Sequence, residues 1–428
     1  MSAARRDSGW LRNGAAALTA LAGAPVLAVG CALRPSWRDG LSERLGLRGP
    51  RARGAIWVHG ASVGEILAAT RLLDALEERG HRVRASTTTS AGRAVLGRQR
   101  PAVEVGYAPL DHPWAAEASM ARSLPVALVL IESELWPVWI ATAARRGVPV
   151  AVVSARISDR SFERYRRLGR LRPRAFRRLT AVGARTSTDA ERFVALGTPA
   201  ERVSVTGDLK VEPPAVAPVL APDLDALLGD AAPFVAASTH AGEEDAALTA
   251  LDAADAAGVP IRLILAPRRL DRVDEVVALV ERRGRSVLRR SRTSGASWRA
   301  DQVLVLDTLG ELSALMSRGR IVFVGGTLAP VGGHNVLEPA LAGRPVLFGP
   351  NTDHVRDAAE LLIASGAARR VSNASELAAA LVAWLCDPTE ARQRGEAGRR
   401  VLEGHRGATA RSVALVERVL PAPAGADS

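Results

Sequence analysis

Residues 321–339 read Ile-Val-Phe-Val-Gly-Gly-Thr-Leu-Ala-Pro-Val-Gly-Gly-His-Asn-Val-Leu-Glu-Pro. The first four residues are β-branched or aromatic, which predicts a buried strand. Two glycine pairs follow and let the backbone turn sharply and come close to a ligand. Asn335 can cap a helix that begins at residues 336–339, with Pro339 in its first turn. The stretch therefore predicts a strand, a glycine loop and a helix start in succession.

Such a succession gathers backbone N–H groups and the positive end of a helix dipole at one point. That arrangement favours an anion, and a phosphate fits it best. Glycine pairs also make ordinary tight turns, and a single pair would favour that interpretation. Two pairs, together with the cap and the nearby carboxylate of Glu338, favour the anion site.

The size of the chain, 428 residues, exceeds one ordinary core and predicts two domains of about 200 residues each. The net charge is +12, from 57 Lys+Arg against 45 Asp+Glu. An Arg-rich genome explains this balance, and so does an acidic partner such as nucleic acid, anionic lipid or a phosphorylated substrate. Two cysteines, Cys31 and Cys386, are too few for a disulfide framework or a cysteine-based metal site.

The N-terminal segment 14–33 carries no charged residue and is about as long as a bilayer-spanning helix. Ala, Gly and Pro25 make it only weakly hydrophobic. It could be a spanning anchor, an uncleaved signal-like segment or a helix lying in the interface, because basic residues on both sides leave its orientation open. No later segment is as long and apolar, so the sequence predicts a soluble body held at a membrane by residues 1–48.

From Ala55 onward, short apolar strands alternate with helical periodicity, which predicts parallel sheets covered on both faces. A proline-rich stretch at 211–222 can form neither a helix nor a central strand. The sequence thus predicts two doubly wound α/β domains, 49–212 and 223–428, joined by a linker at 213–222. The predicted strands are 55–58, 83–86, 126–131, 148–153, 179–182 and 203–205 in the first domain, and 234–237, 261–265, 303–306, 321–324 and 346–348 in the second.

Ligands of such sheets bind outside the carboxyl ends of the strands, and two facing domains would place a cleft between those ends. Glu65 follows a predicted strand and suits a general base. Its spacing from Ser62 equally matches a helix capping box, so both interpretations stand. Glu132 and Glu134 follow another strand and could exchange protons in a partly dry site. Glu132 could instead cap the helix that begins near Pro137.

Several basic residues also follow predicted strands. Lys210 could stabilise a developing negative charge, or it could be a solvated surface lysine. Arg268 and Arg269 could grip a phosphate, or form an exposed salt bridge at a helix start. Residues 164–178 hold eight arginines. Nucleic-acid binding would require more aromatic residues among them or a known binding module, and neither is visible. Contact with anionic headgroups is therefore favoured, and a solvated helix face is the alternative.

The histidines at strand ends, His59, His240 and His334, lack metal-ligand spacing, and no Asp-x-Asp pair precedes them. The sequence therefore predicts no site for a divalent cation.

Eight ordered motifs cover nearly the whole chain and together resemble one family, that of the 3-deoxy-D-manno-octulosonic acid (Kdo) transferases of lipopolysaccharide synthesis. They are His-Gly-Ala-Ser-Val-Gly-Glu (59–65), Glu-Ser-Glu-Leu-Trp-Pro (132–137), Ala-Arg-Ile-Ser-Asp-Arg-Ser (155–161), Arg-Phe-Val-Ala-Leu-Gly (192–197), Val-Thr-Gly-Asp-Leu-Lys (205–210), Ala-Ser-Thr-His-Ala-Gly-Glu-Glu (237–244), Asp-Thr-Leu-Gly-Glu-Leu (307–312) and Gly-Gly-His-Asn-Val-Leu-Glu-Pro (332–339).

The resemblance implies a GT-B glycosyltransferase with CMP-Kdo as donor. The acceptor would be a phosphorylated lipid A precursor (lipid IVA type) at the cytoplasmic face of the inner membrane. The implied reaction inverts the anomeric carbon and uses no metal or cofactor. Motif matches make Glu65 the general base, and Glu132 and Lys210 the groups that stabilise the transition state. The residues implied to hold CMP are Pro267, Arg268, Leu309, Gly310, Glu311, Asn335, Val336, Leu337 and Glu338.

The chain departs from the family pattern at Arg269, where His is usual, and near Ser90, Arg185 and Asp353; none of these departures removes a proposed catalytic residue. One rival interpretation is a nucleotide-sugar 2-epimerase of the same two-domain architecture, which would bind UDP and lack the apolar N-terminus. Another is a membrane-tethered nucleotide-binding protein without catalysis. That second rival gives no reason for Glu65, Glu132 and Lys210 to share one site.

Overall fold

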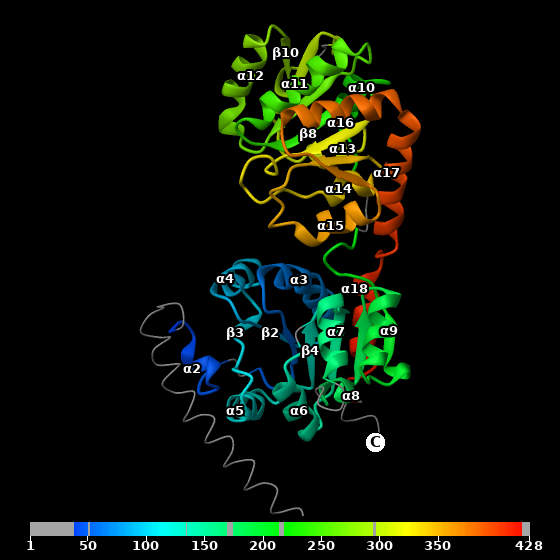
Figure 1. Ribbon diagram of the computed structural model, residues 1–428. Coiled ribbons are helices and arrows are strands. Elements are labelled where there is room, and N and C mark those ends of the chain that lie inside the picture. The colour runs from blue at the N-terminus through cyan, green and yellow to red at the C-terminus, as the bar shows by residue number, and fades with distance from the viewer. Residues whose placement is uncertain are drawn as a thin grey trace, which may run out of the picture. The chain divides into compact units, whose positions relative to one another are not determined.

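The computed structural model describes residues 38–49, 52–133, 135–168, 174–213, 218–293 and 297–421 (Figure 1). The chain forms two compact units. The first contains the described residues up to Glu212 and those from Gly407 onward, and the second contains Pro213 to Arg406. The predicted anchor, 14–33, and Glu134 lie outside the described residues. Within the described residues, no helix has the length and apolar character needed to cross a membrane.

The first unit is built on a seven-stranded sheet in which every described pairing is parallel, in the order β3-β2-β1-β4-β5-β6-β7. Its strands are β1 (Ile56–His59), β2 (Val83–Thr87), β3 (Glu104–Tyr107), β4 (Ala127–Ile131), β5 (Val150–Ala155), β6 (Ala181–Ala184) and β7 (Val203–Val205). Its helices are α2 (Leu41–Arg44), α3 (Val63–Glu78), α4 (Ser90–Gln99), α5 (Pro113–Ser123), α6 (Pro137–Arg145), α7 (Asp159–Arg167), α8 (Ala175–Arg178), α9 (Ser187–Ala195) and α18 (Ala408–Glu417).

The second unit repeats this plan with the strand order β10-β11-β9-β8-β12-β13-β14, again with parallel pairing throughout. Its strands are β8 (Phe234–Thr239), β9 (Leu263–Pro267), β10 (Ser286–Arg289), β11 (Gln302–Val305), β12 (Ile321–Val324), β13 (Val346–Phe348) and β14 (Ala368–Arg370). Its helices are α10 (Pro222–Leu228), α11 (Glu243–Ala256), α12 (Val273–Arg282), α13 (Leu312–Met316), α14 (Leu337–Leu341), α15 (Arg356–Ala364), α16 (Ala374–Cys386) and α17 (Pro388–Glu403).

Both sheets have the doubly wound form that the alternating sequence pattern predicts, and the architecture is of the GT-B type. Central strands such as β4 and β12 are buried along their whole length, because helices cover both faces. The strand order reverses between β1 and β4 in the first unit and between β8 and β12 in the second. These two reversals are where doubly wound sheets bind ligands, outside the carboxyl ends of the strands.

The sequence did not predict three of the strands, β3, β10 and β14. Each lies at an edge of its sheet. An edge strand is covered incompletely, so it needs no continuous apolar run; β10, for example, is nowhere fully buried and β14 is Ala-Arg-Arg. Periodicity therefore identifies the central strands and not these edges.

The end of the chain also differs from the prediction, which placed all of 223–428 in the second domain. Residues from Gly407 onward belong to the first unit, where Figure 1 draws α18 beside α3. Val413, Leu415 and Val416 of α18 are buried in the apolar core of the first sheet. Burial of this apolar face is the physical reason for the return, since the isolated helix could not bury it.

Candidate active site

Three predicted catalytic residues of the first unit gather beside the β1/β4 reversal. Glu65 lies in the first turn of α3, directly after β1, and Glu132 directly follows β4. Lys210 comes after β7, and its Nζ lies 2.5 Å from Oε1 of Glu132. A Cβ atom built on Gly64 would lie 3.4 Å from the same Nζ, so the lysine also reaches the start of α3.

The carboxylate of Glu65 takes part in the capping box that its spacing allowed. Ser62 caps α3 by accepting from Glu65 N, and its own Oγ donates to Glu65 Oε1 over 2.8 Å. Ala61 N donates to Glu65 Oε2, also over 2.8 Å. The side chain is almost fully buried. The capping interpretation is therefore correct, and the contacts fix the direction of a carboxylate at the strand edge.

Glu132 does not cap the helix near Pro137. The first amides of α6, Val138 N and Trp139 N, donate instead to Asp111 Oδ1. Glu132 has a backbone φ of 60°, a left-handed conformation that a non-glycine residue adopts at a cost of about 1–3 kcal/mol and that recurs at functional sites. Burial raises its pKa, as do the charges of Glu65 and Asp208, while Lys210 opposes them.

Lys210 is not a solvated surface lysine, because its side chain is only 20% exposed and is paired with Glu132. The turn that carries it is held by Asp208, whose Oδ1 accepts from Lys210 N. Asp208 Oδ2 lies 3.0 Å from Nη1 of Arg185. The sequence prediction assigned no role to this buried Asp208, although the residue lies within one of the eight motifs.

In the second unit, the residues predicted to hold the nucleotide follow three strands near the centre of the sheet, β11, β9 and β12. Pro267 ends β9 and Arg268 follows it, Leu309 to Glu311 come after β11, and Asn335 to Glu338 come after β12. Between β9 and β12 lies β8, which His240 follows. All of them therefore lie at the carboxyl edge, around the β8/β12 reversal.

The first glycine pair differs from the prediction, because its backbone N–H groups are not free. The carboxylate of Glu243, only 1% exposed, accepts from five amides, those of His240, Gly326, Thr327, Leu328 and Ala329. A carboxylate of the chain itself thus occupies this nest of donors. The only sequence signal for Glu243 is its position in the 237–244 motif at a helix start.

The second half of the loop leaves donors open. Among the described residues, the amides of His334, Asn335 and Val336 have no hydrogen-bond acceptor. Asn335 behaves as predicted: its Oδ1 accepts from Leu337 N over 3.0 Å, and its Nδ2 donates to Glu338 Oε1. Gly332 and Gly333 have φ values of 102° and 89°, which glycine adopts without strain. The N–H groups available to an anion are therefore those after the second glycine pair.

Two imidazoles meet at this edge, a contact that the sequence prediction did not anticipate. Nε2 of His240 lies 2.8 Å from Nε2 of His334. Gly326 makes room for them, because a Cβ there would lie 2.8 Å from His334 Cδ2. Spacing along the chain gives no signal for this pair, because 94 residues separate its members.

The other predicted donor residues differ in how they are engaged. Arg268 is exposed, and no carboxylate in the described ranges lies within ion-pair distance of it. Its neighbour Arg269 pairs with Asp271 at 2.6 Å, the exposed salt bridge that was the alternative interpretation. Glu311 accepts from Arg290 and Thr308; burial raises its pKa, but these two donors outweigh burial and lower it. The carboxylate of Glu311 is therefore engaged within the chain, whereas its neighbours Leu309 and Gly310 are exposed.

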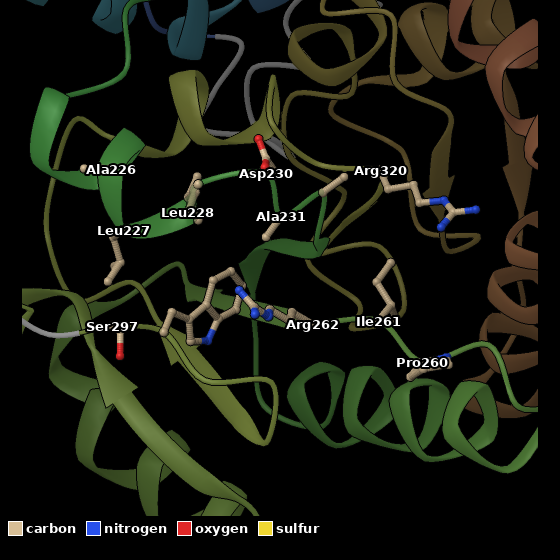
Figure 2. Close-up of a pocket in the computed structure, with 13 residues that line it drawn as sticks. Ala226, Leu227, Leu228, Asp230, Ala231, Pro260, Ile261, Arg262, Ser297 and Arg320 are labelled. Carbon is tan, nitrogen blue, oxygen red and sulfur yellow. The ribbon is translucent and has the colours of Figure 1, made fainter.

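A cavity of about 600 Å3 opens elsewhere in the second unit, and Figure 2 shows Arg262 and Arg320 among the side chains that line it. Arg262 precedes β9 and Arg320 precedes β12, so the cavity lies at the amino-terminal edge of the sheet. No predicted site residue lines it. Within the described ranges, no group of three or more His, Cys, Asp or Glu side chains is placed to hold a metal ion.

Comparison with known proteins adds an independent line of evidence. Residues 39–212 match the family described as 3-deoxy-D-manno-octulosonic-acid transferase (kdotransferase). The 3-deoxy-D-manno-octulosonic acid transferase of Bordetella pertussis is 36% identical over 393 residues, covering 87% of this chain and 90% of the relative. The enzyme of the same name from Haemophilus influenzae is 30% identical over 401 residues, covering 90% and 92%.

A solved structure supports the fold alone. MurG of Acinetobacter baumannii superimposes with a TM-score of 0.52 at 14% identity, covering 86% of this chain and 99% of that protein. At that identity the likeness extends to the two-sheet architecture and not to the chemistry.

Proposed function

This chain belongs to the family of 3-deoxy-D-manno-octulosonic acid transferases, and we propose that it transfers Kdo from CMP-Kdo to a lipid A precursor of the lipid IVA type. Because it belongs to this family, it is a glycosyltransferase of lipopolysaccharide biosynthesis. The observation that carries the finer proposal is the cluster of Glu65, Glu132 and Lys210 at the carboxyl edge of the first sheet.

In the proposed reaction, Glu65 removes the proton of the acceptor hydroxyl while the hydroxyl oxygen attacks the anomeric carbon of Kdo. The bond from that carbon to the CMP phosphate breaks, and its electron pair leaves with the phosphate. Attack from the face opposite the leaving group inverts the anomeric centre. Lys210, held by Glu132, offers a positive charge near the base and stabilises negative charge that develops in the transition state.

The second unit would hold the donor through its cytidylate. The amides of His334, Asn335 and Val336 and the guanidinium of Arg268, none of which has a partner within the described ranges, suit a phosphate. The exposed residues Leu309 and Gly310 would contact the nucleoside. These donors supply charge compensation from the chain itself, which is the basis for proposing a metal-independent reaction without a cofactor; the rate should be unchanged by EDTA.

We further propose that the protein works at the cytoplasmic face of the inner membrane. The apolar segment 14–33 would anchor it, and basic side chains of α7 would meet anionic headgroups. Arg164, Arg166 and Arg167 lie in the last turn of α7, a helix with no buried residue. A phosphorylated lipid acceptor would be attracted to the same basic surface, whereas nucleic acid is not a proposed partner.

The decisive experiment incubates the full-length protein with CMP-Kdo and a lipid IVA acceptor in detergent, followed by mass spectrometry of the lipid. The proposal expects a lipid heavier by one or more Kdo residues and the release of CMP. Unmodified lipid in the presence of correctly folded protein and intact donor would refute it. The same spectra would give the number of sugars added.

The rival 2-epimerase function has support from architecture only. Sequence relatives at 30–36% identity carry the name of Kdo transferases. An epimerase would interconvert UDP-linked hexosamines without any lipid, so incubation with UDP-N-acetylglucosamine tests it directly. We expect no epimer in that assay.

A further inference from the structure

His240 and His334 contact each other through their Nε2 atoms, and this contact suggests a role that the sequence motifs do not imply. The two rings are nearly parallel, with 6° between their planes, and their centroids are 5.1 Å apart. The distance between the centroids equals the Nε2–Nε2 distance of 2.8 Å plus the distance from each Nε2 to the centre of its own ring. The two nitrogens therefore lie on the line that joins the ring centres, and the rings face each other edge to edge and do not overlap.

This geometry fixes how many protons the pair can hold. One Nε2 must carry hydrogen and donate, and the other must present its lone pair and accept. In the neutral pair, the accepting ring therefore carries its hydrogen on Nδ1, and the donating ring has a free lone pair on Nδ1. One further proton fits on that Nδ1 without breaking the Nε2–H···Nε2 bond. A second would place two N–H groups head to head.

The surroundings of His334 disfavour a positive charge on its ring. Burial lowers the pKa of His334, and any positive charge on His240, Arg268 or His354 acts in the same direction. Glu243 opposes them. Its carboxylate, however, is already shared among five backbone amides, which spread its charge. A dianionic phosphate at the adjacent open amides would reverse this balance.

We propose that His240 and His334 act as one proton-accepting unit, which takes up a single proton from solvent when the phosphate monoester of CMP binds beside it. This inference rests on the proposed donor, CMP-Kdo. During transfer, the bond to the sugar breaks and the phosphate gains a negative charge. The pair then carries the matching positive charge, while the acceptor's proton goes to Glu65. Because the charge is needed most by the leaving group, the pair favours the transition state over the bound donor.

The test measures proton uptake by titration calorimetry of CMP into the full-length protein, in buffers of different ionisation enthalpy at pH 7.5. A phosphate monoester has a second pKa of about 6, so free CMP is already dianionic at this pH. The wild type should take up about one proton per CMP bound. His240→Gln and His334→Gln should each bind CMP with uptake near zero. His354→Gln, which removes a neighbouring exposed imidazole, is the matched control and should retain the uptake.

Three results would overturn the inference: no uptake by the wild type, uptake that persists in both variants of the pair, or loss of uptake in His354→Gln. If the two variants lose CMP binding altogether, nitrogen-15 spectra of histidine in the wild type decide the matter. CMP should then move the Nδ1 signal of one ring of the pair from the neutral to the protonated range, and an unchanged signal refutes the proposal. A wild type that does not bind CMP at all would refute the donor assignment as well, which separates the two failures.

Discussion

At the scale of single residues, one carboxylate combines a structural and a chemical role. Glu65 accepts from Ala61 N and Ser62 Oγ, and these contacts hold its rotamer at the start of α3. A carboxylate offers about four acceptor positions on two oxygens, so two are left for a substrate hydroxyl. The capping box thus positions the proposed base and does not compete with it.

Two substitutions separate these roles. Glu65→Gln keeps the size of the side chain but removes the basic carboxylate, so kcat should fall about 10²–10⁴-fold. Ser62→Ala removes the cap and should lower the free energy of unfolding by about 1 kcal/mol, with a far smaller loss of kcat. The lipid assay and urea unfolding measure the two effects. Glu78→Gln, at the exposed end of the same helix, is the control; full turnover by Glu65→Gln would remove the base assignment.

A second residue, His59, makes the stability of the first unit depend on pH. Its ring is fully buried at the end of β1, with Nδ1 2.9 Å from Ser86 Oγ. Burial lowers its pKa from 6.5 to about 3, against the opposing hydrogen bond to the Ser86 carbonyl. The unfolded chain binds a proton on this ring below pH 6.5 and the folded chain does not. Its contribution to stability is therefore complete above pH 6.5 and is lost as the pH falls.

When the pH falls from 7.5 to 5.5, the unfolding free energy of the wild type should decrease by about 1.4 kcal/mol more than that of His59→Gln. Urea unfolding of both proteins at the two pH values gives the difference directly. The variant is expected to be less stable than the wild type at pH 7.5 and to lose less on acidification. An identical pH dependence in the two proteins would show that the folded ring titrates normally.

At the scale of elements, the short helix α14 that carries Glu338 depends on a small-residue face of α17. Ala391, Gly395 and Gly398 of α17 are buried. A Cβ built on Gly395 would collide with the carbonyl oxygen of Gly343, and one on Gly398 would lie 3.1 Å from Ala340 Cβ. The two helices can approach this closely only because the side chains are absent. Packing of α17 thereby sets the position of the predicted donor loop.

The substitution Gly395→Ala should therefore destabilise the second unit by about 2–3 kcal/mol and weaken CMP binding. The collision involves backbone atoms, which cannot move aside as a flexible side chain would. Gly97→Ala in α4 is the matched control: a Cβ there meets nothing within 4 Å, and the change should be neutral or stabilising by about 0.5–1 kcal/mol. Thermal unfolding of both variants checks the contrast, and a stable Gly395→Ala protein would contradict this packing.

At the scale of the whole molecule, the chain enters the first unit twice. Residues up to Glu212 build the sheet, and α18 returns to it after the second unit is complete. The return is held by polar contacts as well as by its apolar face. Thr409 N donates to the Glu212 carboxylate over 2.9 Å, and Arg79 pairs with Glu417 at 2.7 Å. The first unit is therefore completed only by the last part of the chain.

A chain that ends at Arg406 should keep a folded second unit and lose a stable first unit. Removing α18 uncovers apolar surface around Val413, Leu415 and Val416, and at about 1.5–3 kcal/mol for each buried side chain the loss is roughly 5 kcal/mol. Limited proteolysis should cut the first unit of the shortened chain rapidly and spare the second. A shortened chain whose first unit resists protease as well as the full chain does would contradict this expectation.

The sequence by itself determined the two doubly wound halves, their central strands and the position where the first half gives way to the second. Long apolar runs must be buried, and strands buried on both faces form parallel sheets, so this information is local. It also placed Glu65, Glu132 and Lys210 at strand ends. The motifs that carry the family resemblance include these positions, but they do not show which atoms come into contact.

Tertiary structure alone decided the rest. It brought Lys210 to Glu132, filled the first glycine nest with Glu243, and set His240 head-on to His334. It also returned α18 to the first unit. Each of these joins residues far apart in the chain, and their contact depends on strand order and on which apolar face needs cover. Periodicity along a sequence reports how a segment is buried, and it carries no information on which distant segment buries it.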